Sequence, residues 1–184
     1  MHCYGFGDAD NAVRELIKCA AEVTPAEVAG APFFVPHVMA ERGPFWFDGP
    51  RGGMVGINRN TTRAQIARAL VEGVIFADRM VLESTIPVGD EPVYLTGAFG
   101  VDEVIPQMLA DATRRTFDLV VETDLPSLGA AGICAEAVAG TRLPAPTSTQ
   151  TRPRPDRSDL DDERWEQWTR AWSQVTGVEP IAPI

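Results

Sequence analysis

The stretch GGMVGINRNTTRAQIARALVEG, residues 52–73, places an apolar run, a polar turn and a helical pattern next to one another. The apolar run at residues 54–57 is bounded by glycines and an asparagine, which predicts a short buried strand. The side-chain oxygens of Asn60, Thr61 or Thr62 can accept hydrogen bonds from the free amides at a helix start. The stretch therefore predicts a strand that leads through a tight turn into a helix.

Beyond the turn, apolar residues recur every three or four positions, which predicts a long helix that faces a core. The expected core-facing residues are Ile66, Ala69, Leu70, Gly73, Val74, Ala77 and Val81. A glycine inside a helix costs roughly 1 kcal/mol relative to alanine. Gly73 therefore indicates either tight helix packing or a close approach of another part of the chain to the helix backbone.

Composition narrows the class of protein. The chain has 184 residues, 45% of them hydrophobic, which is enough to bury one sizeable core. Its formal net charge of -10 argues against a nucleic-acid surface, because phosphate binding needs clustered Lys and Arg. No apolar run is long enough to span a bilayer, and Met1 is not followed by a basic and then apolar leader.

Several common site types are not expected from the motifs. The three cysteines, Cys3, Cys19 and Cys134, have no metal-like spacing, which favours reduced thiols in a cytoplasmic protein. His2 and His37 have no partner at ligand spacing, so no zinc site is expected. The chain has no GxxxxGK[ST] phosphate loop.

Elsewhere, strand and helix patterns alternate, which predicts an α/β layered structure. We expect helices at residues 11–22, 63–83, 102–114 and 127–139, and strands at 33–35, 54–57, 93–95 and 118–121. Residues 141–158 are rich in Pro, Thr and Arg and predict an extended linker.

A last helix is expected at residues 159–175, with three tryptophans on one face. Trp165, Trp168 and Trp172 fall at positions i, i+3 and i+7, so this face docks onto an apolar surface. That surface belongs either to this same domain or to a separate lobe or second subunit.

Residues 52–73 resemble the second signature of the FGGY carbohydrate kinases. Matching positions are Gly52, Met54, Gly56, Ile57, Gln65, Ile66, Ala69 and Glu72, whereas Leu70 departs. PFFVPHVMAERGPFWFDGPRG (32–52) is similar to the preceding region of xylulokinase-like members. VYLTGAFGVDEVIPQMLAD (93–111) resembles the adenosine-binding segment of the family, and SLGAAGICAEAVAG (127–140) resembles the helix that follows it.

The resemblance implies an α/β fold: an incomplete C-terminal lobe of the actin-like ATPase (ribonuclease H-like) fold, with an added C-terminal helix. Residues 1–140 would form the nucleotide-binding lobe, truncated at its N-terminal side. Residues 141–158 would form the linker, and residues 159–184 the Trp-rich helix and tail.

The resemblance also implies a site for ATP with Mg²⁺. Aligned on Ala110 and Asp111, Gly97 and Ala98 take the first two places of the family's glycine triplet, and Asp102 falls where Ser or Asn is common. Gly97, Ala98 and Asp102 are therefore the expected cofactor-binding residues. Ala98 and Phe99 stand in place of two glycines of the triplet and would narrow the adenine site, and Asp102 would add negative charge. The alternative is a plain strand-to-helix turn with Asp102 as a helix cap.

The family's catalytic aspartate precedes the matched region, so no catalytic residue or metal ligand is expected in this chain. Asp8 follows a glycine, but its position relative to the next helix favours a capping role. Glu41 and Arg42 are candidates for an ion pair that orders the loop before Trp46.

The implied function is transfer of the γ-phosphate of ATP to a hydroxyl of a sugar or polyol, with a ketose such as xylulose favoured. Alone, the chain is expected to be inactive and to need a separate N-terminal kinase lobe. The alternative is a non-catalytic remnant that serves as an oligomerisation or partner-binding module. A gene product without function is a third.

Overall fold

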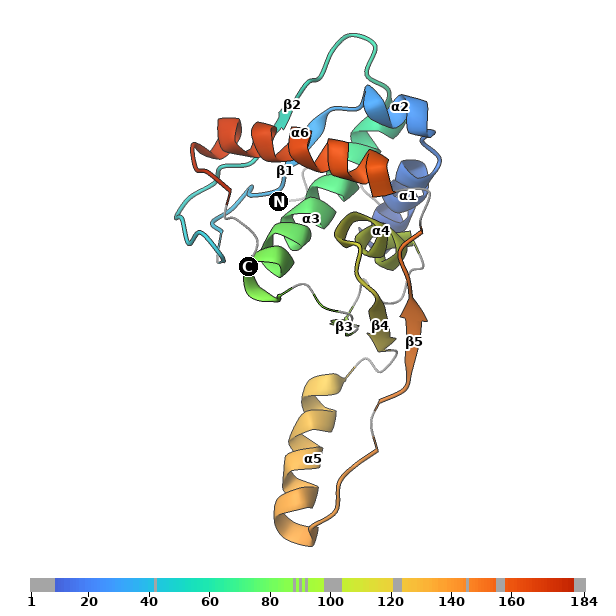
Figure 1. The fold of residues 1–184 in the computed structure, drawn as a ribbon, viewed down its shortest axis with the longest axis vertical. Coiled ribbons are helices and arrows are strands. Elements are labelled where there is room, and N and C mark those ends of the chain that lie inside the picture. The colour runs from blue at the N-terminus through green and yellow to red at the C-terminus, as the bar shows by residue number, and fades with distance from the viewer. Residues whose placement is uncertain are drawn as a thin grey trace.

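A long central helix organises the chain. The computed structural model describes residues 9–41, 43–87, 89, 91, 93–97, 104–120, 124–144, 146–154 and 158–180. The central helix is α3 (Arg63–Thr85) (Figure 1). Around it pack α1 (Ala9–Ala21), α2 (Pro25–Ala29), α4 (Val104–Thr113) and α6 (Ser158–Thr176).

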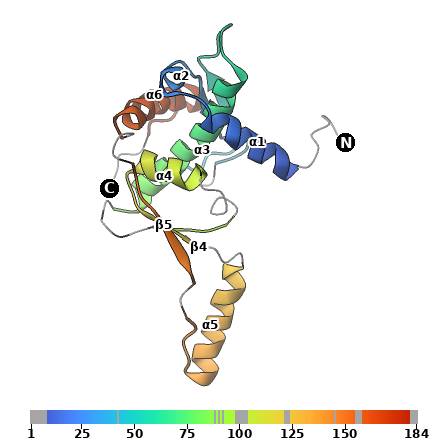
Figure 2. The ribbon, with the colours of Figure 1, turned by 90° about the vertical axis from the view of Figure 1, so that its right-hand side faces the viewer.

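Two small sheets accompany these helices. β1 (Phe33–Val35) and β2 (Gly53–Val55) pair antiparallel, with Phe34 opposite Met54. In the second sheet, β3 (Val93–Leu95) pairs parallel with β4 (Phe117–Val120), and β5 (Ser148–Thr151) pairs antiparallel with β4. α5 (Leu125–Ala139) projects away from the body beyond this sheet, as both ribbon views show (Figures 1 and 2).

The predicted alternation of helices and strands is confirmed, with boundaries within three residues of those expected. Two elements were not predicted. α2 begins at Pro25 after a reciprocal capping box, in which the side chains of Thr24 and Glu27 each accept from the other residue's backbone N–H. β5 lies inside the expected linker 141–158, so part of that segment extends the second sheet rather than remaining free.

The turn before α3 uses one of the three candidate caps. The Thr62 hydroxyl accepts from the Gln65 backbone N–H at 3.1 Å, and the Gln65 side chain accepts from the Thr62 N–H at 3.0 Å. This reciprocal pair satisfies two amides at the helix start that would otherwise be unpaired. Gln65 Nε2 also donates to the Glu27 carbonyl at 2.9 Å, which joins the start of α3 to α2.

Gly73 lies where β1 crosses α3. A Cβ at this position would overlap the carbonyl oxygen of Phe34 and lie 3.0 Å from its carbonyl carbon. The close approach anticipated from the sequence is therefore real, and the approaching group is the backbone of β1. The absence of a side chain lets this strand lie directly on the helix.

The expected core-facing stripe of α3 is only partly correct. Ala69 and Gly73 are buried, but Ile66, Leu70, Val74 and Ala77 are half-buried and Val81 is 38% exposed. The buried apolar side chains lie at intervening positions of the helix: Ala67, Val71, Ile75, Phe76 and Met80. α3 therefore carries apolar residues around most of its circumference, which is typical of a helix inside a larger core.

The tryptophan face of α6 packs on this same domain, which settles the choice left open by the sequence. Trp168 and Trp172 are completely buried, and Trp165 stacks on Trp168 with ring centroids 5.5 Å apart. Trp168 Nε1 donates to the Phe34 carbonyl at 2.8 Å. The indole N–H therefore has the partner that a buried donor needs.

A buried ion pair also fixes α6. Arg164 contacts the Glu72 carboxylate on α3, and both side chains are only 3% exposed. Arg164 donates further to the carbonyls of Ala31 and Pro32, so it links three segments that are distant in sequence. Removal of Glu72 would leave the buried charge of Arg164 without a carboxylate partner, whereas without Arg164 the Glu72 carboxylate would still pair with Arg68.

Candidate nucleotide-binding site

The expected nucleotide site lies in the turn between β3 and α4. β3 and β4 run parallel, and the Val93 N–H donates to the Thr116 carbonyl at 2.9 Å. Both strands therefore end at the same edge of the sheet, and the carboxyl ends of parallel strands are where such sheets bind ligands. Gly97 follows β3 at this edge.

Gly97 has a glycine-type backbone conformation and is exposed to solvent. Its φ of +91° is a conformation that residues with a Cβ rarely adopt. Apart from its chain neighbours, no atom of the described residues lies within 4 Å of the place where a Cβ would stand, which leaves its backbone open to a flat ring. The other two expected residues, Ala98 and Asp102, lie outside the described residues, as does Asp8.

The starts of the two helices that follow β3 and β4 in sequence differ in the hydrogen-bonding groups that they offer a ligand. Pro106 stands in the first turn of α4 and has no N–H, and both Ile105 and Pro106 are buried toward the core. α5 starts after β4, where the Asp124 side chain accepts from the Ser127 N–H at 3.2 Å. Asp124, which sequence analysis overlooked, caps α5 four residues after the end of β4. Its Asp-Leu-Pro pattern before a small-residue helix was the signal for such a cap.

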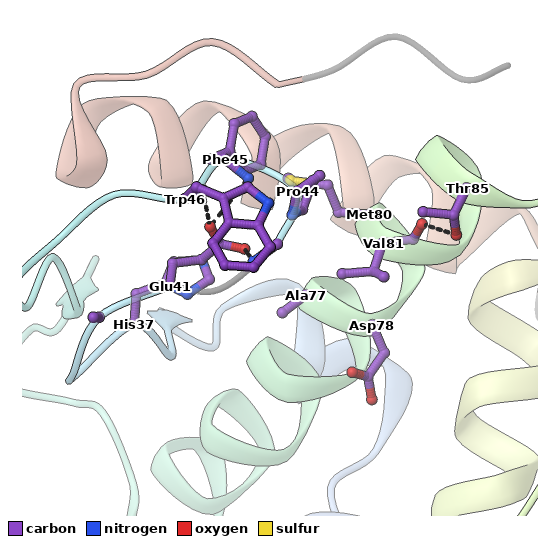
Figure 3. Close-up of a pocket in the computed structure, with 12 residues that line it drawn as sticks. His37, Glu41, Pro44, Phe45, Trp46, Ala77, Asp78, Met80, Val81 and Thr85 are labelled. Carbon is purple, nitrogen blue, oxygen red and sulfur yellow. Dashed lines mark hydrogen bonds between the residues drawn. The ribbon is translucent and has the colours of Figure 1, made fainter.

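Apart from the turn after β3, a hollow of about 750 Å³ lies between the loop after β1 and the C-terminal half of α3 (Figure 3). Glu41 shapes its loop wall. The buried Glu41 carboxylate accepts from the backbone N–H groups of Gly43, Phe45 and Trp46 at 2.7, 3.1 and 2.7 Å. The predicted pair with Arg42 lies outside the described residues, but Glu41 orders the loop through these backbone contacts.

Trp46 and Asp78 give this hollow its chemical character. Trp46 has a φ of +54° and is 70% exposed, so its indole stands open at the hollow. Asp78 lies on the α3 wall, with its carboxylate pointing away from the loop (Figure 3). Asp78 is exposed by surface area, yet it stands between two largely apolar hollows, and this desolvation raises the pKa of its carboxyl to about 6.

His37 lines the same hollow and joins the loop to α6. Trp172 Nε1 donates to His37 Nε2 at 2.9 Å, which requires that nitrogen to be unprotonated. Burial lowers the pKa of the His37 imidazole, and the nearby Glu41 charge opposes this shift without overcoming it. The imidazole therefore serves as a hydrogen-bond acceptor at neutral pH. Within the described ranges, no group of three or more His, Cys, Asp or Glu residues could hold a metal ion.

Comparison with known proteins gives the family. The model of the FGGY family of carbohydrate kinases, C-terminal domain, matches residues 5–138. The chain belongs to the FGGY family of carbohydrate kinases. The resemblance found in the sequence is thereby confirmed, and FGGY carbohydrate kinases use ATP with a metal.

Curated relatives of this FGGY chain are much longer than it is. Glycerol kinase 2 of Thermotoga maritima is 28% identical over 177 residues, covering 90% of this chain and 36% of the relative. A glycerol kinase of Thermococcus gammatolerans is 30% identical over 129 residues, covering 67% of this chain and 26% of the relative. The chain thus spans about a third or less of the length of these relatives.

Solved structures confirm the actin-like ATPase fold of the FGGY chain. Xylulose kinase from Lactobacillus acidophilus matches with a TM-score of 0.76 at 18% identity, over 89% of this chain and 35% of that one. Gluconate kinase from the same organism matches with a TM-score of 0.76 at 19% identity, over 95% and 37%. At such identities the likeness concerns the fold alone. Separately, no helix in the described ranges is long and apolar enough to cross a membrane.

Proposed function

We propose that this chain is the ATP-binding C-terminal portion of a kinase that transfers the γ-phosphate of ATP to a hydroxyl of a sugar or polyol. The observation that carries the proposal is the match of residues 5–138 to the C-terminal domain of the FGGY kinases. The open backbone at Gly97, at the carboxyl edge of the parallel strands, supports it. ATP bound with Mg²⁺ would supply the phosphoryl group.

In this proposal the chain's own residues bind and orient the nucleotide. Gly97 would present its backbone to the adenine ring, because a side chain there would occupy the space that the ring needs. Ala98 and Asp102 would border the same ring, as the sequence analysis proposes. Asp124 lies after the neighbouring strand and would keep the start of α5 in place through its bond to Ser127.

The sugar-binding site and the catalytic base would belong to the part of the kinase that this chain does not span. We therefore propose that the chain alone does not phosphorylate sugars. Among substrates, the xylulokinase-like residues of the 32–52 segment favour a ketose such as xylulose. The relatives bear the names of glycerol, xylulose and gluconate kinases, so these three compounds form the test panel.

The direct test is nucleotide binding by the purified chain. ATP with Mg²⁺ at 100 times its Kd should stabilise the fold by about 2.7 kcal/mol, measured as a rise in Tm. Gly97→Ala should weaken ATP binding about tenfold in calorimetry, since the new Cβ fills the open face. Gly49→Ala is the matched control, because Gly49 has a similar φ of +83° and no described atom within 4 Å of its Cβ position, but lies outside the proposed site. The absence of any ATP-induced shift would refute the proposal.

The second test is catalysis. A coupled assay with xylulose, gluconate and glycerol should show no ADP release above background for the chain alone. Sugar phosphate formed by the chain alone would contradict the assignment of the base and sugar site to another part of the kinase.

A non-catalytic partner-binding or oligomerisation module is the second candidate. The uncovered apolar surface of α5, in which no residue is buried, favours it specifically. This candidate predicts no response to ATP together with a concentration-dependent dimer in analytical ultracentrifugation. Two measurements, ATP-induced stabilisation and concentration-dependent dimerisation, therefore distinguish the two candidate functions.

A further inference from the structure

Asp111, in the last turn of α4, carries a carboxylate that is buried away from the nucleotide turn. Its side chain is only 3% exposed, and it contacts the segment that follows β5. Oδ1 accepts from the backbone N–H of Arg154 at 2.7 Å and from Gln107 Nε2 at 2.9 Å. Oδ2 accepts from both Nε, at 2.9 Å, and Nη2 of the Arg154 guanidinium. One carboxylate therefore receives four hydrogen bonds, two of them from a charged fork.

Gln107 extends these contacts to the backbone that leaves β5. Its Nε2 also donates to the Arg152 carbonyl at 3.0 Å, and Arg152 directly follows the last residue of the strand. Gln107 and Asp111 are four residues apart, so they lie on the same face of α4. We refer to these two residues together with Arg152 and Arg154 as the Asp111 cluster. The cluster ties one face of α4 to the end of β5.

The sheet that holds β5 also holds the strand before the nucleotide turn. Phe117 of β4 pairs with Val93 of β3 on one side and with Thr151 of β5 on the other, which places the three in one row across the sheet. β3 leads to Gly97, and α4 begins after the turn. β5 runs toward α4 (Figure 1). Both sides of the nucleotide turn are therefore fixed to a single sheet, one through β3 and the other through the Asp111 cluster.

The place where α4 begins depends on the orientation of the whole helix. α4 has 10 residues and, at about 1.5 Å per residue, spans about 15 Å. A rotation of about 10° around Asp111 would move the first turn of the helix by roughly 2 Å. A gap of about 1 Å already removes up to half of the dispersion energy of a packed contact. A small change in the orientation of α4 is therefore enough to weaken contacts between the turn and a flat ring.

The charge of Asp111 argues for a role in orientation rather than in packing. Leu109, Ala110 and Ala112 are buried and already hold α4 against the core. A buried ion pair adds little net stability relative to apolar side chains of similar volume, because removing charges from water is costly. Its directional hydrogen bonds, in contrast, are satisfied in one orientation of the helix only.

We propose that Asp111 is a positioning residue for the nucleotide. Through Arg154 and Gln107 it sets the orientation of α4, and thereby holds the turn after β3 in the geometry that binds ATP. Asp111 itself does not touch the nucleotide, because its carboxylate is buried and bonded to the segment that follows β5. The inference rests on the proposed function, since it takes ATP as the ligand of this turn.

The test compares two variants of the Asp111 cluster in the full chain. Asp111→Asn keeps the shape of the side chain and removes its charge. Arg154→Ala removes the partner at a side chain that is 47% exposed, so this variant should fold even where the first does not. We expect each variant to raise the Kd for ATP with Mg²⁺ about tenfold in calorimetry. An unchanged Kd in a folded variant would overturn the proposal.

Asp162→Asn is the matched control. Asp162 lies on α6 and also accepts from two arginines, Arg79 and Arg114, but none of these three residues belongs to α4 or to the nucleotide turn. The change should lower Tm, because two ion pairs are lost, and should leave the Kd for ATP unchanged. Equal weakening of ATP binding by Asp162→Asn and Asp111→Asn would show that the effect follows from general destabilisation, and would contradict the assignment.

A spectroscopic measurement tests the same inference without nucleotide. In nuclear magnetic resonance spectra of the isotope-labelled chain, the amide signal of Gly97 should shift in Asp111→Asn and in Arg154→Ala, because α4 changes its orientation. The signal should stay in place in Asp162→Asn. An unmoved Gly97 signal in both cluster variants would overturn the proposal, even where the affinity for ATP falls.

The two measurements separate this inference from the proposed function. Suppose that the unaltered chain does not bind ATP but the Gly97 signal shifts in both cluster variants. This result would refute the proposed function and sustain the role of Asp111 in holding the turn. ATP binding by the unaltered chain, with the Kd and the Gly97 signal unchanged in both variants, would do the reverse.

Discussion

Because Gly73 has no side chain, β1 can lie directly on α3. The sequence marked Gly73 as unusual because glycine weakens a helix, but the approaching group, Phe34, comes from a residue 39 positions earlier. Periodicity contains no information about such a distant contact. The position could therefore be predicted to matter, whereas its partner could not.

Gly73→Ala should destabilise the fold. The new Cβ would overlap the Phe34 carbonyl, which belongs to a strand and cannot rotate away, so we expect a loss of about 2 kcal/mol in the free energy of unfolding. Urea denaturation measures this loss. Gly129→Ala is the matched control in α5, where no atom lies within 4 Å, and it should be neutral or stabilising by up to about 1 kcal/mol. Equal stability of the two variants would show that β1 moves aside without cost.

His37 should make stability depend on pH. Its pKa is lowered in the folded chain, so the unfolded chain takes up the proton first as the pH falls below 6.5. Stability should therefore be full above pH 6.5 and decrease below it, as protonation also removes the acceptor for Trp172 Nε1. Tm measured from pH 7.5 to 5 checks this, and His37→Phe should flatten the dependence.

Titration of Asp78 changes stability with pH in the opposite direction, so its contribution must be separated from that of His37. Its pKa is raised to about 6, so the folded chain binds the proton more readily than the unfolded chain, and stability should rise as the pH falls from about 6 toward 3.8. The His37 measurement is therefore best made in an Asp78→Asn background. A Tm in that background that stays constant down to pH 5 would contradict the role assigned to His37.

Among the elements, α6 contributes a large share of the core. Sequence analysis placed its three tryptophans on one face but left their partner open, because an apolar face does not identify the surface that it meets. In the structure that surface is β1, α3 and the loop after β1. Docking of the helix also explains the buried Arg164, whose charge needs Glu72 on another element.

Trp168→Ala should cost about 3–5 kcal/mol in the free energy of unfolding, because it empties the centre of the contact between α6 and α3. It also leaves the Phe34 carbonyl without its donor. Chemical denaturation followed by circular dichroism measures the loss. Trp46→Ala, at a 70% exposed tryptophan, should change stability by less than about 0.5 kcal/mol. A Trp168→Ala variant as stable as Trp46→Ala would mean that α6 is not part of the cooperative core.

At the scale of the whole molecule, local sequence patterns predicted the positions of helices and strands well, but predicted their pairing and burial less well. Strands such as β3 and helices such as α3 follow from turn residues and periodicity, which are local signals. β5 was missed because its sequence, STQT, is polar and becomes a strand only through pairing with β4. The stripe of α3 was assigned to the core because apolar composition alone does not reveal that a cover is incomplete.

For the candidate site, the sequence predicted a position in the chain but not the surroundings of its side chains. The family resemblance pointed to the turn after β3 and to Gly97. The structure shows that Gly97 has a positive φ, which sequence alone did not predict. Asp78 and His37 could not be assigned from sequence, because their shifted pKa values arise from neighbours on other elements. Gly97, Ala98 and Asp102 all remain predictions as cofactor-binding residues.

The position of α6 along the chain also bears on how the protein is made. Of the described elements it is synthesised last, yet Trp168 and Trp172 at its centre complete the packing of β1 and α3. The earlier segments therefore leave the ribosome with the apolar side of β1 and α3 still open to the cell. Chaperones that hold nascent chains would meet this surface first, and a premature stop codon before residue 158 would leave it open permanently.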